Sequence, residues 1–176
     1  MYTWLSLASA AELSKLEFHI DKEFAPKAVA QKLSSDFSDA AKGLLIERNY
    51  IDKDYRSTYY NFYSKKGRRY RSDCVRLHFF DETVSFDEKT LKLSSADQKL
   101  DHHYFGYMVL RPTGIATIGR SVLTPDIRKG ASRYIIASEH KVHLLGHKLL
   151  IHGFPSMDQH IDISVCAHAT CWSILR

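Results

Sequence analysis

Long apolar runs are missing from this sequence of 176 residues, and none approaches the roughly 20 residues that a membrane-spanning helix needs. A secretory signal is missing as well. No basic residue precedes the apolar N-terminal stretch, and Glu12 follows that stretch too early. We therefore expect a protein that has no membrane partner.

Cysteine is scarce, and the chain contains only Cys74, Cys166 and Cys171. Cys166 and Cys171 are five residues apart on an expected helix, so their side chains diverge and we expect no disulfide between them. A small, odd number of cysteines favours a reducing compartment. We predict a cytoplasmic location.

Two common ligand motifs are also missing. Gly114 and Gly119 lack the spacing of a phosphate-binding loop, and no helix that begins with Lys and Ser or Thr follows them. His143 and His147 have the i, i+4 spacing of a zinc-binding helix, but the residues between them are Leu-Leu-Gly, without the glutamate of a metalloprotease motif. We therefore predict no cofactor and no metal site.

What is present is the composition of an ordinary single domain, with 44% hydrophobic and 26% charged residues and no internal repeat. Helical patterns come first, then a run of strands, then one late helix, which predicts an α+β fold with a largely antiparallel sheet. We divide this domain into an N-terminal helical region (1–46), a basic Tyr-rich segment (48–80), a strand-rich region (81–153) and a C-terminal part (154–176) with a helix that Cys166 opens.

The N-terminal region contains two expected helices. A short helix covers residues 9–16, with Ser9 as its N-cap. A longer helix covers Pro26–Lys42, because proline suits the first turn, apolar residues recur at helical spacing, and Gly43 supplies a stop. Residues 44–46 then form either a short buried strand or the tail of that helix.

Strands are predicted where aromatic and β-branched residues dominate between turn signals. The clearest is Tyr104–Leu110, which Arg111 and Pro112 end. The others are Val75–Phe80, Ile115–Leu123, Tyr134–Ala137, a hairpin over Val142–Ile151 that turns at Gly146, and an edge hairpin of Val84–Phe86 with Leu91–Leu93.

The segment from Arg48 to Phe80 concentrates both positive charge and tyrosine. It contains nine Lys or Arg residues against three Asp residues, a net charge of +6, whereas the whole chain has +5. Six of the ten tyrosines lie here, and Tyr55, Tyr59 and Tyr63 share one helical face. A basic loop around Gly67 follows them.

This segment has two interpretations. Arginine side chains can contact phosphates and tyrosine rings can stack on bases, so the segment could serve a non-enzymatic adaptor that binds nucleic acid or an acidic protein. Alternatively, it is a solvated loop above a core helix lined by tyrosines. The candidate binding residues are Arg56, Tyr59, Tyr63, Lys65, Lys66, Arg68, Arg69 and Arg71.

A second candidate site centres on Cys166, which follows an alternating apolar run and precedes a segment rich in Ala, Trp, Ile and Leu. A cysteine at a helix start lies beside unpaired backbone N–H groups and the positive end of the helix dipole. Both favour the thiolate that a nucleophile needs. The alternative is a buried, inert cysteine that only fills space.

Gln159 lies seven residues before Cys166, and Trp172 lies on the helix that Cys166 opens. This arrangement resembles the nucleophile region of papain-like cysteine peptidases, which place a Gln shortly before the catalytic Cys. The resemblance covers residues 154–176 only. It implies that Cys166 attacks an amide or ester carbonyl, while the Gln159 side chain and the Cys166 backbone N–H stabilise the oxyanion.

Cys171 and Trp172 offer another alignment, because they resemble the Cys-Trp pair of papain-type and transglutaminase-type nucleophiles. No Gln lies at the matching distance upstream of Cys171, however. Cys171 would also lie one turn inside the helix, where no free backbone N–H group is available. We therefore prefer Cys166 as the nucleophile.

The family supplies its general-base His, and the Asn or Asp that orients it, from strands after the nucleophile helix. The sequence has no such strands after Cys166. We therefore expect a truncated or incomplete peptidase-like domain that is inactive as this chain alone and that a second chain completes. A homo-oligomer is the other expectation, since a helix without its usual neighbours leaves apolar surface to cover.

Overall fold

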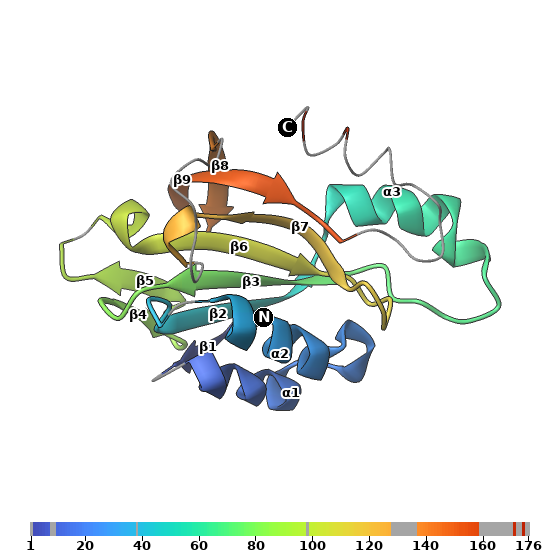
Figure 1. The fold of residues 1–176 in the computed structure, drawn as a ribbon, viewed down its shortest axis with the longest axis horizontal. Coiled ribbons are helices and arrows are strands. Elements are labelled where there is room, and N and C mark those ends of the chain that lie inside the picture. The colour runs from blue at the N-terminus through green and yellow to red at the C-terminus, as the bar shows by residue number, and fades with distance from the viewer. Residues whose placement is uncertain are drawn as a thin grey trace.

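The computed structural model describes residues 2–7, 10–37, 39–97, 99–127, 137–158, 171 and 174. They form an α+β fold, as predicted, built on a seven-stranded antiparallel sheet in the order β1-β2-β3-β6-β7-β9-β8 (Figure 1). Its strands are β1 (Tyr2–Ser6), β2 (Gly43–Tyr50), β3 (Cys74–Phe80), β6 (Tyr104–Leu110), β7 (Ile118–Leu123), β8 (Ser138–Leu144) and β9 (His147–Ser156). A separate hairpin pairs β4 (Val84–Asp87) with β5 (Lys92–Ser95).

The interior strand β3 is buried along its whole length, including Arg76 and His78. Successive side chains of a strand point to opposite faces of its sheet. The odd-numbered residues of β3 accordingly enter one hydrophobic core, and its even-numbered apolar residues enter another. Arg76 and His78 share the second face, so a polar cluster lies inside that core.

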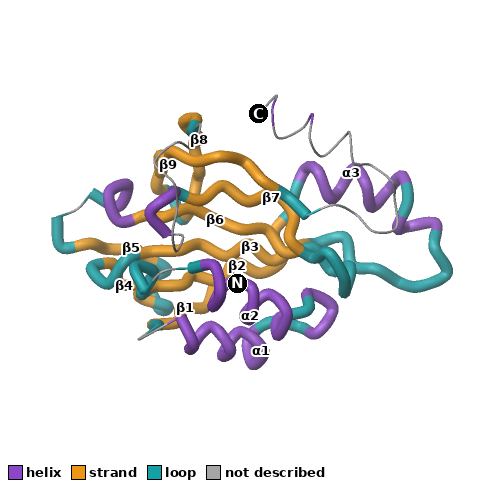
Figure 2. Tube along the Cα trace, viewed as in Figure 1, coloured by secondary structure: helices purple, strands orange, loops and turns teal. Residues whose placement is uncertain are grey.

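The first core lies beneath the N-terminal helices. These are α1 (Leu16–His19) and α2 (Pro26–Asp36) with the 3-10 helices η1 (Ala10–Lys15) and η2 (Lys22–Phe24), which gather on one side of the sheet (Figure 2). Their apolar side chains pack on the odd-numbered face of β3 and on neighbouring strands. The main contributors from the helices are Leu13, Leu16, Phe24, Val29 and Leu33.

Helix α2 ends at Asp36, so the predicted end of the Pro26–Lys42 helix is wrong. Phe37 leaves the helical conformation, with φ −90° and ψ 142°, and buries its ring against Phe79 at a centroid distance of 5.0 Å. Burial of an aromatic ring outweighs the helical preference of the residues that follow. β2 begins at Gly43, and the segment after it is a strand rather than a helix tail.

The opposite face of the sheet carries the second core. Side chains of α3 (Lys53–Asn61), of the β4–β5 hairpin and of the β8–β9 hairpin meet there. The remaining 3-10 helices are η3 (Tyr63–Lys65), η4 (Leu100–His103) and η5 (Pro125–Ile127). None of the described helices is long and apolar enough to cross a membrane.

Most of the predicted strands are confirmed, and β6 has the predicted bounds. The β8–β9 hairpin turns at Leu145 and Gly146, both of which have positive φ. β7 begins at Ile118 rather than Ile115, because the preceding residues form a turn with Ala116 at φ 50°. The predicted helix over residues 9–16 is a 3-10 helix that continues into one α-helical turn, and its predicted cap Ser9 lies outside the described residues. Most of the predicted strand Tyr134–Ala137 also lies outside them.

Candidate functional site

The two predicted catalytic residues, Gln159 and Cys166, lie outside the described residues. Within the segment that follows Cys166, the structure describes Cys171 and Ile174, and both are helical and exposed. Upstream, the description reaches Asp158, one residue before Gln159. The structure therefore describes the residues directly before Gln159, up to Asp158.

The end of β9 is held against β7. Ser156 lies opposite Ser121, and two residues further on the Asp158 backbone N–H donates to the Ile118 carbonyl at 2.9 Å. Strand pairing thus continues as a single hydrogen bond beyond the last residue of β9. The position of Asp158 is set by the sheet rather than by a free loop.

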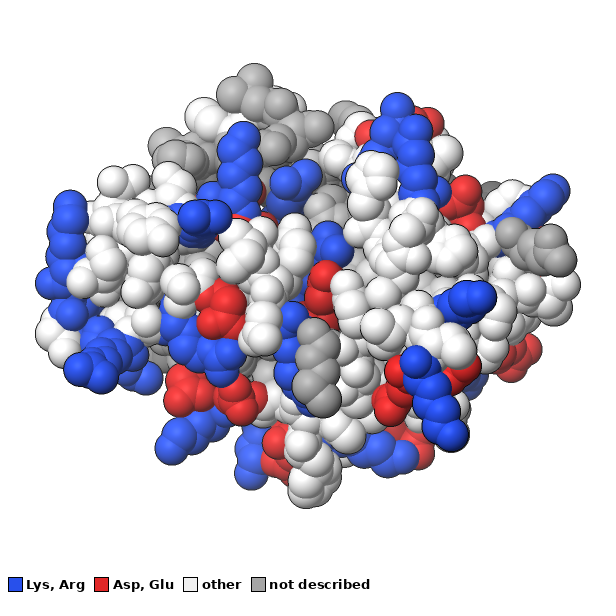
Figure 3. Space-filling view, turned by 180° about the vertical axis from the view of Figure 1, so that it is seen from behind, with Lys and Arg blue, Asp and Glu red and all other residues white. Residues whose placement is uncertain are grey.

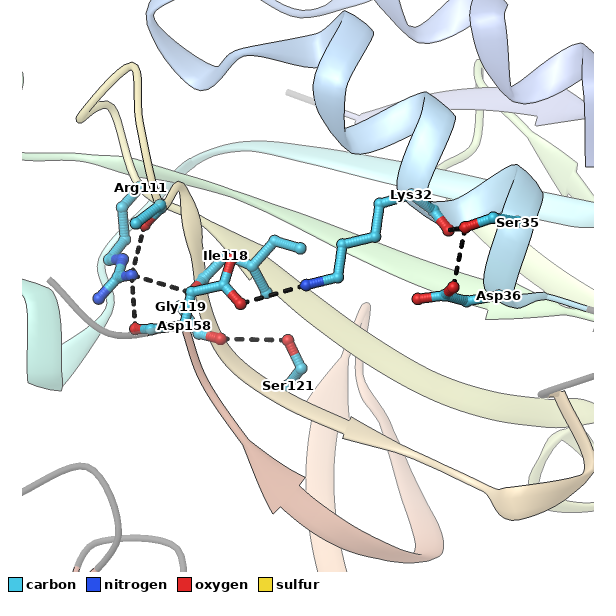
Figure 4. A network of polar contacts seen from close by, with 9 residues as sticks. Lys32, Ser35, Asp36, Arg111, Ile118, Gly119, Ser121 and Asp158 are labelled. Carbon is cyan, nitrogen blue, oxygen red and sulfur yellow. Dashed lines mark hydrogen bonds and ion pairs between the residues drawn. The ribbon is translucent and has the colours of Figure 1, made fainter. Parts of the chain in front are cut away.

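Arg111 is the main anchor of this region, and only 2% of its surface is exposed. Its Nη2 atom donates to the carbonyl oxygens of Ile118 and Asp158, each at 2.9 Å, and to that of Ala116 (Figure 4). Burial lowers the pKa of Arg111, but a guanidinium remains charged at neutral pH. One buried cation therefore joins the turn before β7 to the chain that leads into Gln159.

Gly119 makes room for this arrangement. A Cβ atom at Gly119 would lie 3.2 Å from Cγ of Arg111, which is tighter than ordinary van der Waals contact. The absent side chain lets the aliphatic stem of Arg111 lie directly against β7. Arg111 was not among the predicted site residues. The Arg-Pro pair indicates only the end of a strand, and no neighbouring residue in the sequence indicates that Arg111 donates to three carbonyl groups.

A second contact reaches Asp158 from the helical layer. Lys32 on α2 lies with Nζ 3.2 Å from Oδ1 of Asp158, and both side chains are partly exposed (Figure 4). Beside this ion pair, a cavity of about 240 Å³ opens between α2 and the sheet. Its apolar lining comes from Leu33, Phe37, Met108, Ile118, Leu123 and Met157.

A polar cluster is buried in the second core around Glu47. Arg76 Nε donates to Oε2 of Glu47 at 2.7 Å, and the Tyr2 hydroxyl donates to Oε1 at 3.0 Å. His78 lies between two partners, with Nε2 3.4 Å from Glu47 Oε2 and Nδ1 2.9 Å from the Tyr104 hydroxyl. The Arg76 guanidinium also covers another aromatic ring of this core, that of Tyr50.

Burial and the contacts within the cluster together determine its protonation states. Burial lowers the pKa of His78 to about 4, and it outweighs the hydrogen bond to Glu47 that favours the charged ring. For Glu47, burial alone would raise the pKa, but the contacts with His78 and Arg76 lower it to about 2. The cluster at neutral pH is thus an Arg–Glu ion pair beside a neutral histidine. With no exposed surface and both ring nitrogens in contact, His78 supports the core rather than a reaction.

The pKa of His103 is shifted in the opposite direction to that of His78. His103 lies between two carboxylates, with Nδ1 2.6 Å from Oδ2 of Asp81 and Nε2 3.0 Å from Oδ1 of Asp97. The hydrogen bond to Asp81 raises the pKa of His103 most strongly. Among the residues that the structure describes, no group of three or more His, Cys, Asp or Glu side chains has the arrangement of a metal site.

Between the end of β2 and the start of β3, the basic Tyr-rich segment folds as α3, η3 and a loop. Tyr55 and Tyr63 are 1% and 2% exposed, and their rings pack 5.8 Å apart in the second core. Tyr59 is half-buried beside Tyr55. The tyrosine face of the helix therefore lines the core. Tyr63, a candidate binding residue, supports the helix from inside.

The cations of the candidate set divide into two groups. Arg71 is engaged by two carboxylates, Asp21 and Asp73, and its Nη2 lies 2.7 Å from Oδ2 of Asp73. The cations on the outer side of α3 and on the loop after η3 are exposed, except Lys66, which is partly buried. These are Arg56, Lys65, Lys66, Arg68 and Arg69.

Asp52 is the N-cap of α3, and its removal should destabilise the protein. Its Oδ1 accepts a hydrogen bond from the Tyr55 backbone N–H at 2.8 Å, and the residue is 3% exposed. We expect Asp52→Ala to lower the free energy of unfolding by about 1–2 kcal/mol, because a buried helix end loses its acceptor. Asp52→Asn keeps an acceptor and should cost less. Urea unfolding of both variants measures this, and equal losses would contradict the capping role.

No family model matches the chain, and neither a curated protein nor a solved structure shows significant similarity to it.

Proposed function

We propose that the chain carries the nucleophile side of a papain-like acyl-transfer site, with Cys166 as nucleophile and Gln159 as oxyanion donor. The observation that supports it best is the anchoring of Asp158 by Arg111, Ile118 and Lys32. An oxyanion donor must be held within a fraction of an ångström of its working position. Asp158, the residue directly before the proposed donor, has its own position set by these contacts.

The proposed chemistry is attack by the Cys166 thiolate on the carbonyl carbon of a peptide amide or an ester. The carbonyl π electrons move to oxygen, where the Gln159 side-chain amide and the Cys166 backbone N–H donate hydrogen bonds. Collapse of the intermediate breaks the bond to the leaving group and leaves a thioester on Cys166. A departing amine needs a proton from an acid other than these two residues, whereas the phenolate of an activated ester leaves without one.

The first test measures the thiolate directly. The Cys171→Ser background removes the exposed cysteine, and Cys74 is a buried internal reference whose pKa burial raises well above the ordinary value. We expect iodoacetamide to label Cys166 at a rate that changes by less than about twofold between pH 7 and pH 8.5, because the thiol is already ionised. A rate that rises about tenfold per pH unit, as for an ordinary thiol, would contradict the proposal.

The second test separates the oxyanion donor from the nucleophile. A nitrophenyl ester should acylate Cys166, detected as added mass on the intact protein, and Cys166→Ser should abolish that addition. We expect Gln159→Ala to slow acylation about 100-fold and leave alkylation unchanged, since only acylation forms an oxyanion. Gln31→Ala, on the exposed side of α2, is the matched control. Equal acylation rates in the Gln159 and Gln31 variants would exclude the proposed role of Gln159.

A further inference from the structure

A second surface of the protein presents exposed cations on α3, on η3 and on the loop that follows η3. Among the described residues, no carboxylate lies within 4 Å of the cationic groups of Lys53, Arg56, Lys65, Arg68 or Arg69, all of which are exposed. We call these five residues the basic face. They come from α3, from η3 and from the loop after η3, which lie together at one end of the molecule (Figure 1).

Two carboxylates that contact Arg71 are already engaged. Arg71 holds both Asp21 and Asp73, so these carboxylates do not neutralise the basic face. In Figure 3, blue side chains occupy the left end of the molecule, where α3 and its loop lie, and red side chains lie further in. The cations thus gather at one end, although the net charge of the whole chain is only +5.

Aromatic rings lie under or beside these cations. The Arg56 guanidinium is 5.8 Å from the ring centroid of Tyr60, and that of Arg68 is 5.2 Å from the ring centroid of Tyr70. Tyr60 is 56% exposed, which is unusual for a large aromatic side chain. Its ring stands edge-on to Tyr59 at a centroid distance of 5.3 Å. The Tyr60 ring is therefore exposed on the surface, packs against Tyr59 and has the Arg56 guanidinium beside it.

Two contacts hold the basic loop after η3 against α3 and η3. The Tyr55 hydroxyl donates to the Arg71 carbonyl at 2.9 Å, and Tyr70 packs on Tyr63 with ring centroids 4.7 Å apart. Tyr55 and Tyr63 belong to the buried core. The two parts of the basic face therefore keep a constant spacing, which lowers the entropy lost when a ligand binds both.

We propose that the basic face binds single-stranded nucleic acid, with the five cations on phosphates and a base stacked on Tyr60. Cationic grooves with interleaved aromatic rings are how proteins hold single strands without sequence preference. Exposed small polar residues of the same segment, namely Ser57, Asn61 and Ser72, add hydrogen-bond donors for phosphate oxygens. An acidic protein partner would use the charges but would have no need of the exposed ring.

The test is fluorescence anisotropy with a labelled single strand of about 15 nucleotides, as DNA and as RNA, over a range of salt concentrations. We expect micromolar affinity at low salt and a slope of log affinity against log salt of about −3.5, as about five phosphate contacts on a single strand produce. Lys65→Glu with Arg69→Glu should weaken binding more than tenfold and make the slope shallower by about 1.4. The charge-matched control is Lys89→Glu with Lys92→Glu on the β4–β5 hairpin.

Tyr60→Ala distinguishes nucleic acid from other anions. We expect a loss of roughly 5- to 100-fold for the single strand with an unchanged salt slope, because stacking is lost and phosphate contacts remain. If Tyr60→Ala binds the strand as wild type does, or if polyglutamate competes as well as the strand, the face accepts any polyanion and the proposal is overturned. Equal losses in the two charge-reversal variants would overturn it as well. Unchanged thermal unfolding verifies that each variant is folded.

Discussion

Replacing Arg111 by Met is expected to lower the free energy of unfolding by about 3 kcal/mol, the largest effect of a single polar substitution that we predict. Met keeps the aliphatic volume of the side chain but removes the Nη2 donor to the carbonyls of Ala116, Ile118 and Asp158. Buried carbonyl groups without donors cost about 1–3 kcal/mol each, and the relief of a buried charge offsets part of this. Urea unfolding followed by far-UV circular dichroism measures the change.

Lys32→Met is the control for Arg111→Met. Lys32 also contacts Asp158, but its ion pair is partly exposed, so its loss should cost less than about 1 kcal/mol. The comparison also bears on the proposed site. Near-native acylation of Cys166 in Lys32→Met and slow acylation in folded Arg111→Met would assign the positioning of Gln159 to Arg111. A stability equal to wild type in Arg111→Met would contradict the anchoring role.

The second large effect is acid sensitivity. We expect the free energy of unfolding to fall by about 3 kcal/mol between pH 6.5 and pH 4, because His78 gains a proton in the unfolded chain near pH 6.5 but in the folded protein only near pH 4. The unfolded state thus binds more protons over this window. Glu47 acts in the same direction at lower pH. Its folded pKa of about 2 lies below its unfolded value, so its contribution is complete above pH 4.5 and falls as pH approaches 2.

His103 provides the contrast. Its pKa is raised in the folded protein, so its stabilising contribution is complete below the unfolded pKa and disappears as pH rises through the folded value. His78→Gln should flatten the stability profile between pH 6.5 and 4.5, whereas His103→Gln should leave that acid limb intact. Urea midpoints at half-unit pH steps give the profiles. A His78→Gln profile parallel to wild type would refute the assignment to His78.

The strands were predictable because their patterns are local. Tyr104–Leu110 has the aromatic and β-branched residues of a buried strand, and its bounds agree with the structure. The burial of Arg76 and His78 was not predictable, because two polar residues in a strand normally indicate a solvent-exposed face. Their partner Glu47 lies 29 residues before Arg76, and only the pairing of β2 with β3 brings it close.

The site was predictable only in part, for the same physical reason. The sequence indicates which residue types suit a thiol nucleophile, because helix starts and nearby amides are local features. It does not indicate that Arg111 reaches Asp158, 47 residues later. In the basic segment, Tyr63 and Arg56 were both candidate binding residues. In the structure Tyr63 is buried in the second core and Arg56 is exposed.

The full burial of β3 has a consequence for biosynthesis. Its partners are β2 on one side and β6 on the other, and β6 follows β3 only after the β4–β5 hairpin and η4. While the ribosome has yet to release β6, one edge of an almost wholly apolar strand has nothing to pair with. Such an edge is a template for intermolecular pairing. A pause in translation between residues 80 and 104 should thus favour aggregation, and a chaperone that binds extended segments should reduce it.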